Sequence, residues 1–425
     1  MRIALLSFGT RGDVQPFVAI GLALKERGHD VVVAANVNHQ AFVETCGLTW
    51  APIAGDIDAL LRSERGQRWL AKGSIVALLR QFKGFLKDLG DDVERDVEAA
   101  TAGADAIVCG VLLANIARIF SEQRKIPMIV SHTFPALASR TVPNAMIDPP
   151  APFGLHRPAS LAFSWLVWRT LGEADHSARR RRGMPVARGE ASAEQLRLGR
   201  PSIHVWSPAL QPRPPDWPEH EVITGFCGLQ KSERAKLGET EAAKKLQAFV
   251  DDGPPPFFIG LGSMPVLQPE PMVRMVVDVA RSLGVRVILG ANWHEAPTVK
   301  AGLPSSMTLC GAVDHDALFP QCAAVLHHGG SGSTSTSLRA GKPTMVCSIL
   351  GDQPFWGRRV VELGVGSFER FHRLNAARLH AGLRRLLDPE VVRRAAELGV
   401  RMRAEDGPNT AADAVLGIIA RGAAV

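Results

Sequence analysis

The sequence predicts an α/β protein with two Rossmann-like domains, each built on a doubly wound parallel sheet. Short apolar strands alternate with amphipathic helices in both halves of the chain, and a proline-rich stretch separates the two sets. The length of 425 residues exceeds what one core usually organises. With 46% hydrophobic and 21% charged residues, the composition is typical of a folded chain and excludes disorder as the main state.

The first half opens on a strand, a glycine-rich turn and a helix. Residues 3–8 are apolar and predict a buried strand, and apolar positions recur at helical spacing from Val14 to Glu26. Further strands are predicted at 31–35, 106–109 and 127–131. The segments 56–100 and 158–200 are instead predicted to be amphipathic helices, which either face the core or form the wall of an apolar pocket.

A proline-rich segment, 207–225, is predicted to link an N-terminal domain of residues 1–206 to a C-terminal domain of residues 226–404. A helix over 405–425 is expected to follow and to pack back on the first domain. The second domain is predicted to hold strands at 257–261, 285–289, 307–309, 323–326 and 344–347, with helices at 270–282 and 333–340. In open α/β sheets the ligand lies beyond the carboxyl ends of the strands, so we expect a site in a cleft between the domains.

Composition also narrows the function. The six cysteines are far apart and form no CxxC pair, which favours buried free thiols over a zinc or redox site. The formal charge of +7 is concentrated at Arg179 to Arg182 without a recognisable nucleic-acid module, so a small anion is the favoured partner. No apolar run approaches the ~18 residues of a membrane span, and no signal peptide precedes the first strand, so we expect a cytoplasmic protein.

The most informative segment runs from Ala323 to Gly341. It predicts a buried strand, two histidines, a Gly/Ser turn and a helix. Backbone amides at such a helix N-terminus are unpaired and attract anions, and glycines let an anion approach closely. No GK[ST] follows and no GxGxxG fits, so a P-loop and a dinucleotide fingerprint are both disfavoured. We therefore predict a phosphate-binding turn.

Two further turns extend this prediction. Gly260 to Met264 ends a predicted strand, and Gly351 to Trp356 follows another strand twenty residues after the phosphate-binding turn. Asp352 and Gln353 place an acid beside an amide, which suits the adjacent hydroxyls of a hexose. A phosphate contact combined with a hydroxyl contact indicates a nucleotide sugar.

At these residues the chain resembles the inverting family 1 glycosyltransferases of the GT-B fold, in particular the branch that acts on sterols and antibiotic aglycones. The motifs that carry the resemblance stand in family order and cover most of the chain: 8–16, 224–226, 261–263, 327–334 and 351–357. The resemblance implies a hexosyltransferase that takes glucose or another hexose from UDP-sugar or dTDP-sugar as co-substrate, with no cofactor. Its acceptor would be a small hydrophobic natural product or lipid.

The resemblance also implies which residues bind the donor. His328 would contact the diphosphate, helped by amides and hydroxyls of the turn, and Ser263 would reach it from the opposite loop. The segment ending at Val313 would hold the base through its backbone, and Asp352 with Gln353 would hold the sugar. His327 is expected only to pack beneath the loop. The full donor set is Gly12, Ser263, Val313, His328, Gly330, Gly332, Ser333, Thr334, Asp352 and Gln353.

Asp13 is the expected catalyst, because inversion needs a base that takes the proton of the acceptor hydroxyl. It stands where many relatives have a histidine. The acid that supports that histidine in relatives has no counterpart at 107–111, which fits an aspartate acting without a relay. The alternative role of Asp13 is to cap a helix that begins at Val14. His132 is an alternative base or an acceptor contact, and Phe134 and Trp356 are expected to contact the acceptor.

No metal is expected at the site. The two DxD-like pairs, Asp56/Asp58 and Asp314/Asp316, are better explained as helix caps, and helix dipoles with His328 would stabilise the leaving diphosphate.

The Arg179–Arg182 cluster is expected to be solvated, with an anionic lipid surface as the alternative. We expect no nucleic acid partner, no stable membrane insertion, and a monomer or homodimer. A lipid-linked sugar transferase, a GT-B epimerase and a catalytically inactive nucleotide-sugar-binding partner subunit remain alternative functions.

Overall fold

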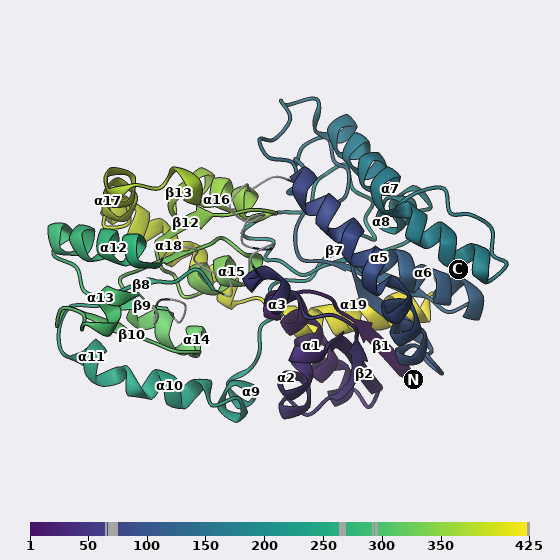
Figure 1. Cartoon of the computed structure of the whole chain (residues 1–425), viewed down its shortest axis with the longest axis horizontal. Coiled ribbons are helices and arrows are strands. Elements are labelled where there is room, and N and C mark those ends of the chain that lie inside the picture. Colours follow the sequence, from purple (N-terminus) through teal and green to yellow (C-terminus); the bar gives the residue numbers. More distant parts are fainter. Residues whose placement is uncertain (64–65, 67–74, 263–268, 291–292, 294–295, 423–425) are drawn as a thin grey trace. The chain divides into compact units, whose positions relative to one another are not determined.

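A computed structural model describes the chain except residues 64–65, 67–74, 263–268, 291–292, 294–295 and 423–425 (Figure 1). The described chain forms two compact units. Unit 1 comprises residues 1–60, 74–229 and 406–425, and unit 2 comprises residues 61–73 and 230–405. Each unit contains one parallel sheet, as the alternation of strands and helices predicted.

Within the described residues, the unit 1 sheet has seven parallel strands in the order β3-β2-β1-β4-β5-β6-β7. The strands are β1 (Arg2–Leu6), β2 (Asp30–Asn36), β3 (Thr49–Ile53), β4 (Ala106–Gly110), β5 (Met128–His132), β6 (Ile203–His204) and β7 (Val222–Ile223). β1, β2 and β4 are buried on both faces, which is why they read as continuous apolar runs.

The helical elements of unit 1 are α1 (Arg11–Glu26), η1 (Val37–His39), α2 (Gln40–Thr45), α3 (Ile57–Arg62), α5 (Ile75–Ala100), α6 (Ala114–Arg124), α7 (His156–Arg181), α8 (Ala191–Arg197) and α19 (Gly407–Ala420). The C-terminal helix α19 packs beside α1 (Figure 1). Arg27 at the end of α1 joins the two helices, since its guanidinium donates to the side chains of Asn409 and Asp413. The last part of the chain therefore completes unit 1.

The proline-rich segment is a packed part of unit 1, and the change of unit comes later, between Leu229 and Gln230. Trp206 and Trp217 are buried, and the Trp217 indole N–H donates to the backbone oxygen of Ala138. The segment then returns to the sheet as the two-residue edge strand β7. Prolines lie in the connection and not in a ladder, as their missing N–H requires.

Unit 2 contains six parallel strands among its described residues, in the order β10-β9-β8-β11-β12-β13. They are β8 (Phe257–Ile259), β9 (Val287–Leu289), β10 (Met307–Leu309), β11 (Ala324–His327), β12 (Thr344–Ser348) and β13 (Gly366–Arg370). The helical elements are α9 (Lys231–Lys236), α10 (Glu239–Lys245), α11 (Gln247–Asp251), α12 (Pro269–Leu283), α13 (Pro297–Lys300), α14 (His315–Leu318), η3 (Phe319–Gln321), α15 (Ser331–Arg339), α16 (Gln353–Glu362), η4 (Phe371–Arg373), α17 (Ala376–Arg385) and α18 (Pro389–Arg403).

The arginines at the end of α7 are all paired with carboxylates; Arg180 and Arg181 are exposed, as expected of a solvated cluster, whereas Arg179 is buried. Arg179 is buried and donates to Asp175 and Glu122. Arg180 pairs with Glu173. Arg181 and Arg182 both bind Glu94 of α5. Arg179, Arg181 and Arg182 therefore tie the end of α7 to α5 and α6, Arg180 pairs within α7, and all four arginines are paired with carboxylates.

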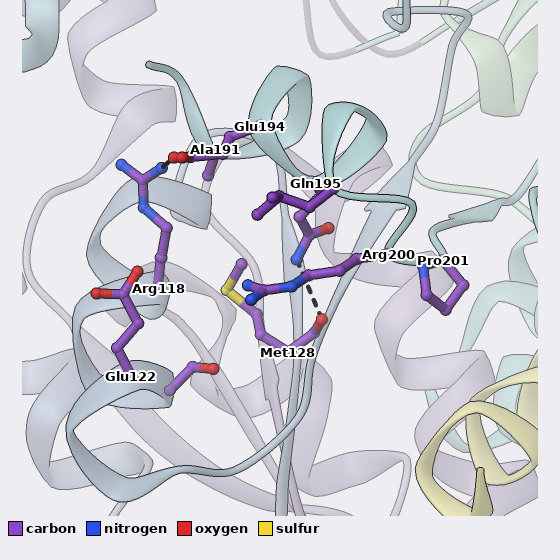
Figure 2. A pocket seen from close by; sticks show the side chains of 10 residues that line it. Arg118, Glu122, Met128, Ala191, Glu194, Gln195, Arg200 and Pro201 are labelled. Carbon is purple, nitrogen blue, oxygen red and sulfur yellow. Dashed lines mark hydrogen bonds and ion pairs between the residues drawn. The ribbon is translucent and has the colours of Figure 1, made fainter. Parts of the chain in front are cut away.

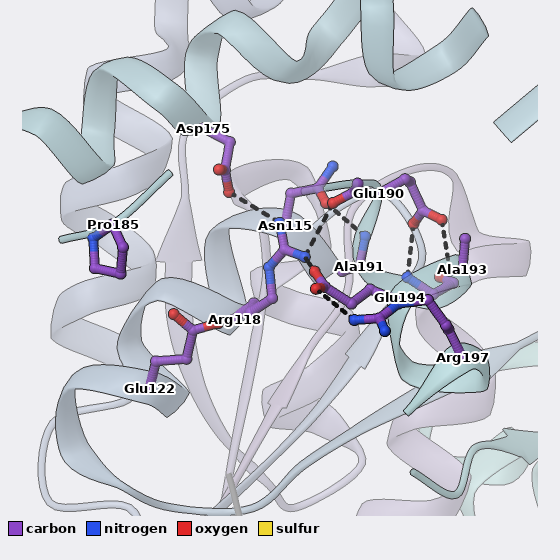
Figure 3. Close-up of polar contacts among 12 residues, drawn as sticks. Asn115, Arg118, Glu122, Asp175, Pro185, Glu190, Ala191, Ala193, Glu194 and Arg197 are labelled. Atoms are coloured by element: carbon purple, nitrogen blue, oxygen red, sulfur yellow. Dashed lines mark hydrogen bonds and ion pairs between the residues drawn. The ribbon is translucent and has the colours of Figure 1, made fainter. Parts of the chain in front are cut away.

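The same network continues into the interior of unit 1 (Figure 3). Arg118 of α6 is buried between the carboxylates of Asp175 and Glu194, and its guanidinium donates to Glu194 at 2.6 Å. Burial raises the pKa of Asp175 against the opposing effect of Arg118 and Arg179. Because an unpaired buried charge costs several kcal/mol, on the order of 3–5, these partners must stay together. The network fixes α6, α7 and α8 to one another.

None of the helices among the described residues is long and apolar enough to span a membrane.

Candidate active site

The β11–α15 turn is built on a buried histidine. The backbone N–H of Gly329 donates to Nδ1 of His327 at 2.9 Å, so the ring proton lies on Nε2 and is donated to Oγ of Ser337 at 3.1 Å. Burial lowers the pKa of His327 well below its usual value. A neutral histidine of fixed tautomer thus holds the turn from beneath, which is the packing role expected for it.

The turn also requires its glycines. Gly329 has φ +93°, and a Cβ there would lie 2.4 Å from Cγ1 of Val346. Gly330 is the N-cap of α15 and, among the described residues, no side chain caps this helix. The amides of Ser331, Gly332 and Ser333 therefore begin a helix without a side-chain cap, and this is the anion-attracting arrangement that the sequence predicted.

His328 stands directly over this helix N-terminus. A Cβ built on Gly330 would lie 2.6 Å from its Nε2, and one built on Gly262 would lie 2.7 Å from its Cε1. The ring is thus held between the β8 turn and the β11 turn. Burial lowers the pKa of His328 to about 4, so the imidazole is neutral at neutral pH. Its Nδ1 is buried and has no hydrogen-bond partner among the described residues.

The hydroxyl residues of α15 divide into two groups. Thr334 is fully buried, and its hydroxyl donates back to the oxygen of Gly330 at 3.0 Å, so its side chain supports the turn from inside. Ser333 is half-buried at the open end of the helix. Of the two, Ser333 is the hydroxyl placed where a ligand could meet it.

The β12–α16 turn places Asp352 and Gln353 at the carboxyl end of β12, the strand next to β11. Gln353 is buried, and its Oε1 accepts from the amides of Ile349 at 2.7 Å and Leu350 at 3.1 Å. Its Nε2 donates to none of the described residues. Oδ2 of Asp352 accepts from the indole N–H of Trp356 at 2.7 Å. Gln353 thus shapes the turn with its oxygen and leaves its amide nitrogen for another acceptor.

Trp356 has a different place from the one expected. It is fully buried in α16, with its N–H on Asp352, so its ring packs inside unit 2 and does not present a face to an acceptor. In the structure, Trp356 instead orients the Asp352 carboxylate. The helical spacing of four residues between them explains the contact.

The base-binding segment predicted at 311–313 follows β10. Gly311 is exposed and Val313 is buried, so its backbone borders the surface while the valine side chain anchors it. Asp314 caps α14, accepting from the amides of Asp316 and Ala317, and the capping interpretation of this pair is confirmed. Arg234 neutralises both carboxylates. Ser263 lies outside the described residues.

In unit 1, Asp13 lies in the first turn of α1. The helix begins at Arg11 and not at Val14, because Thr10 is the N-cap and Asp13 the third helical residue. Oδ2 of Asp13 accepts from the Thr10 amide at 2.8 Å and from the Thr10 hydroxyl at 3.1 Å. The Asp13 carboxylate therefore does close the helix end, as the capping alternative proposed, but from inside the helix.

Two residues that sequence reasoning missed hold this turn. Asn36, fully buried at the end of β2, accepts from the amide of Gly9 at 2.9 Å and donates to the oxygen of Gly55. His39 contacts the Gly9 oxygen through Nε2 at 3.1 Å. Gly9 itself has φ +143°, and a Cβ there would lie 2.3 Å from Oδ2 of Asp13. Nothing in the spacing of Asn36 or His39 along the chain indicates this contact.

His132, the alternative base, is fully buried at the end of β5 and stacks on His204, with ring centroids 5.1 Å apart. Burial lowers the pKa of His132 well below its usual value. Neither ring nitrogen has a partner among the described residues. A ligand would have to reach an enclosed ring, whereas Asp13 is partly exposed. Gly12 is exposed next to Asp13, and Phe134 is half-buried two residues beyond His132.

A separate pocket of about 240 Å³ lies in unit 1, at the end of the sheet away from His132 (Figure 2). Met128, the first residue of β5, and Pro201, just before β6, line it together with Arg118, Glu122 and Gln195. The pocket therefore lies at the amino ends of β5 and β6. The carboxyl end of β5 is His132, and β6 leads into the proline-rich segment. None of the predicted site residues lines it.

Within the described part of the chain, no group of three or more His, Cys, Asp or Glu side chains is arranged to hold a metal ion.

Comparison with known proteins identifies both halves of the chain. The N-terminal domain model of glycosyltransferase family 28 matches residues 3–143, and the C-terminal domain model of erythromycin biosynthesis protein CIII-like proteins matches residues 274–417. A sterol 3-beta-glucosyltransferase of Arabidopsis thaliana is 30% identical over 97% of this chain and 67% of its own length. An uncharacterized glycosyltransferase of Mycobacterium leprae is 30% identical over 97% of this chain and 96% of its own.

Solved structures agree at the level of the fold. The glycosyltransferase of kitacinnamycin has a TM-score of 0.68 at 23% identity and covers 98% of each chain. The glycosyltransferase VinC, solved with dTDP, has a TM-score of 0.65 at 18% identity and covers 99% of this chain and 100% of its own. Both are similar to this chain along its whole length. With parallel sheets in both units and relatives of this kind, the chain belongs to the family 1 glycosyltransferases of the GT-B fold.

Proposed function

We propose that this glycosyltransferase moves a hexose, with glucose as the first candidate, from UDP-sugar or dTDP-sugar to a hydroxyl of a small hydrophobic acceptor, with inversion at the anomeric carbon and without a metal ion. The observation that carries the donor part is the start of α15. There, a helix without a side-chain cap begins beneath a neutral, half-buried histidine. The acceptor part rests on Asp13.

Apart from Gly12 of unit 1, donor binding is assigned to unit 2. The backbone amides of Ser331, Gly332 and Ser333 would receive the diphosphate, and His328 would donate one hydrogen bond to it. The positive end of the helix favours the charge that develops on the diphosphate as it leaves. The dTDP complex of VinC supports a nucleotide diphosphate as the ligand of this fold. These groups would do the work of a metal ion, which is why we propose a metal-independent reaction.

The sugar itself would meet the β12–α16 turn. The Trp356 indole orients Asp352, and the backbone amides of Ile349 and Leu350 hold the Gln353 oxygen, which aims its Nε2 group. A carboxylate accepts and an amide nitrogen donates, so neighbouring sugar hydroxyls would be held in one orientation. Gly12, Ser263, Val313 and Gly330 complete the proposed donor contacts.

Asp13 would act as general base. In the proposed step the acceptor oxygen forms a bond to the anomeric carbon, its proton passes to the Asp13 carboxylate, and the bond from the anomeric carbon to the diphosphate oxygen breaks with its electron pair. Thr10 orients the carboxylate by two hydrogen bonds to Oδ2. His132 and Phe134 are proposed to contribute to the acceptor side and not to accept the proton.

The names of the relatives support the proposed acceptor class. The plant relative acts on sterols by its name, and the kitacinnamycin enzyme and VinC are glycosyltransferases of the same fold. A hydrophobic molecule with one reactive hydroxyl is the chemistry that we propose for this chain.

The direct experiment incubates the purified protein with UDP-glucose, dTDP-glucose and a panel of sterol, macrolide and polyketide acceptors, and detects glycosides by mass spectrometry, with and without excess EDTA. We expect a glycoside that forms equally well in EDTA, with the opposite anomeric configuration from the donor. Activity that requires added Mg²⁺ or Mn²⁺ contradicts the metal-independent mechanism. Donor binding without transfer to any acceptor would favour a catalytically inactive partner subunit.

A further inference from the structure

Helix α7 and the loop before it present an apolar surface to solvent. Phe153 is 84% exposed and Trp165 is 62% exposed, and Leu155, Leu161 and Leu166 are also exposed. Residues 153–170 are all described, and Ser160 is the one buried residue among them. Single exposed apolar side chains are normal, but a group of five within fourteen positions marks an interaction surface.

Two of these side chains lie on one stripe of the helix. Leu161 and Trp165 are four residues apart and lie on one face of α7, whereas Leu166 is turned by about 100° from Trp165, and Phe153 and Leu155 precede the helix. Arg169 is four residues beyond Trp165, and its guanidinium lies 5.7 Å from the Trp165 ring centroid. An exposed arginine and an exposed tryptophan are therefore held side by side, at the edge of the apolar surface.

The charge of the segment has one sign. Residues 149–172 contain no Asp or Glu, whereas Arg157 and Arg169 are both exposed there. The second half of α7 is the opposite. Its arginines are paired with carboxylates of α5, α6 and α7 itself, and Asp175, Ala178 and Arg179 are buried. The helix is thus anchored by its C-terminal half and leaves its N-terminal half on the surface of unit 1.

We propose that this surface, formed by residues 153–169, docks on the headgroup region of an anionic lipid bilayer. Exposed Leu, Phe and Trp side chains on a helix and the loop before it, flanked by arginines and without a carboxylate, are the composition of surfaces that lie in a membrane interface. A second copy of the chain fits less well. A two-fold contact through the same patch would set Arg157 and Arg169 against their own counterparts without an acid to neutralise them. The proposal is independent of the proposed transfer reaction.

The test is sedimentation of the full chain with vesicles of phosphatidylglycerol and phosphatidylcholine in equal parts, and with vesicles of phosphatidylcholine alone. We expect the protein to bind the anionic vesicles more tightly. Each arginine at an anionic surface contributes about fivefold in affinity, so Arg157→Gln/Arg169→Gln should lose about 25-fold on anionic vesicles and almost nothing on neutral ones. Phe153→Ser/Trp165→Ser should lose binding to both.

The matched control is Val400→Ser/Arg401→Gln on α18, where Val400 is also 62% exposed and Arg401 is exposed beside it. This variant should sediment like the unchanged protein. Because every substituted side chain is exposed, melting temperatures should not move. A blue shift of Trp165 emission on anionic vesicles, measured as the difference between the unchanged protein and Trp165→Phe, gives a readout that needs no destabilising change.

Three results would overturn the proposal. The unchanged protein could remain in the supernatant with anionic vesicles. The α7 variants could bind as tightly as the control variant. Light scattering could show a dimer that Phe153→Ser/Trp165→Ser dissociates, which would assign the surface to a second copy of the chain.

Discussion

The strand–turn–helix segments β1–α1 and β11–α15 have the same arrangement, but they differ at the N-terminus of the helix. In unit 1, the protein closes the end of α1 itself, because Asp13 accepts from the amide and hydroxyl of Thr10. In unit 2, no described side chain caps α15, and a neutral histidine stands over its first amides. The first turn of α1 contains a fixed anion, the Asp13 carboxylate, whereas the N-terminus of α15 leaves room for the anion of a ligand.

This difference explains the division of labour. A carboxylate held in one orientation by hydrogen bonds suits a group that must accept a proton. Open amides at the end of another helix suit a diphosphate that arrives and leaves. Different side chains hold the two turns in place. Asn36 and His39 fix the first turn through Gly9, and His327 fixes the second turn through Gly329.

The largest effect should come from Asp13→Asn. An amide cannot accept the proton, so turnover should fall by ~10² to 10⁴. Asp13 is the third residue of α1 and not its N-cap, but the Asn oxygen can still accept from Thr10, so the melting temperature should change little. Steady-state kinetics with a thermal melt checks both. Retained turnover would move the base to His132, and His132→Ala would then abolish transfer.

His328→Ala should weaken donor binding by about tenfold to a hundredfold, because a hydrogen bond to a charged group contributes about 1.5 to 3 kcal/mol. Affinity for the acceptor should barely change, since the acceptor residues are assigned to unit 1. Calorimetry with the sugar nucleotide measures the first and a binding assay with the acceptor the second. Unaltered nucleotide binding in a folded variant would mean that α15 does not receive the diphosphate.

The pH dependence of donor binding should also report on His328. Its pKa in the free protein is about 4, and a neighbouring diphosphate would raise it by favouring the imidazolium. The protein would therefore take up a proton on binding, and affinity should increase as pH falls from the raised value towards about 4. Calorimetry of a sugar nucleotide in buffers of different ionisation enthalpy counts the protons. The slope should disappear in His328→Ala.

Gln353→Glu should have the smallest effect, and it separates the two functions of this side chain. A Glu oxygen can still accept from the amides of Ile349 and Leu350, so the turn should keep its shape. The Nε2 donor is lost, which should weaken sugar nucleotide binding about twofold to tenfold, the contribution of one hydrogen bond. Affinity for the bare nucleotide diphosphate should stay the same. Equal losses for both ligands would assign Gln353 to the turn alone.

The sequence predicted the central strands well and missed short or half-exposed strands at and beside three of the four sheet edges. β1, β2 and β4 are buried on both faces, so an apolar run signals each of them. Four strands were missed. β3 is partly exposed and contains Pro52, β13 is mostly partly exposed and ends in charged residues, and β6 and β7 have two residues each. β3, β7 and β13 are edge strands and β6 lies beside β7, and partial exposure or short length leaves no clear apolar run to mark these four strands.

Motifs located the turns of the site, but they could not give the direction of each side chain. Thr334 and Trp356 lie in the predicted motifs, yet both point inward and support the turns. Gln353 commits its oxygen to backbone amides, and Asn36 reaches Gly9 from a different strand. Such contacts depend on rotamers and on residues far apart in the chain, which the order of residues in a motif does not contain.

The most direct test of the central claim is one calorimetric comparison, the affinity of UDP or dTDP for Asp13→Asn and for His328→Ala. If the diphosphate binds at the open end of α15 and Asp13 is a base already held by its own helix, Asp13→Asn should bind the nucleotide like the unchanged protein and His328→Ala should bind it at least about tenfold more weakly. Equal affinities in the two variants, or a loss confined to Asp13→Asn, would contradict the account.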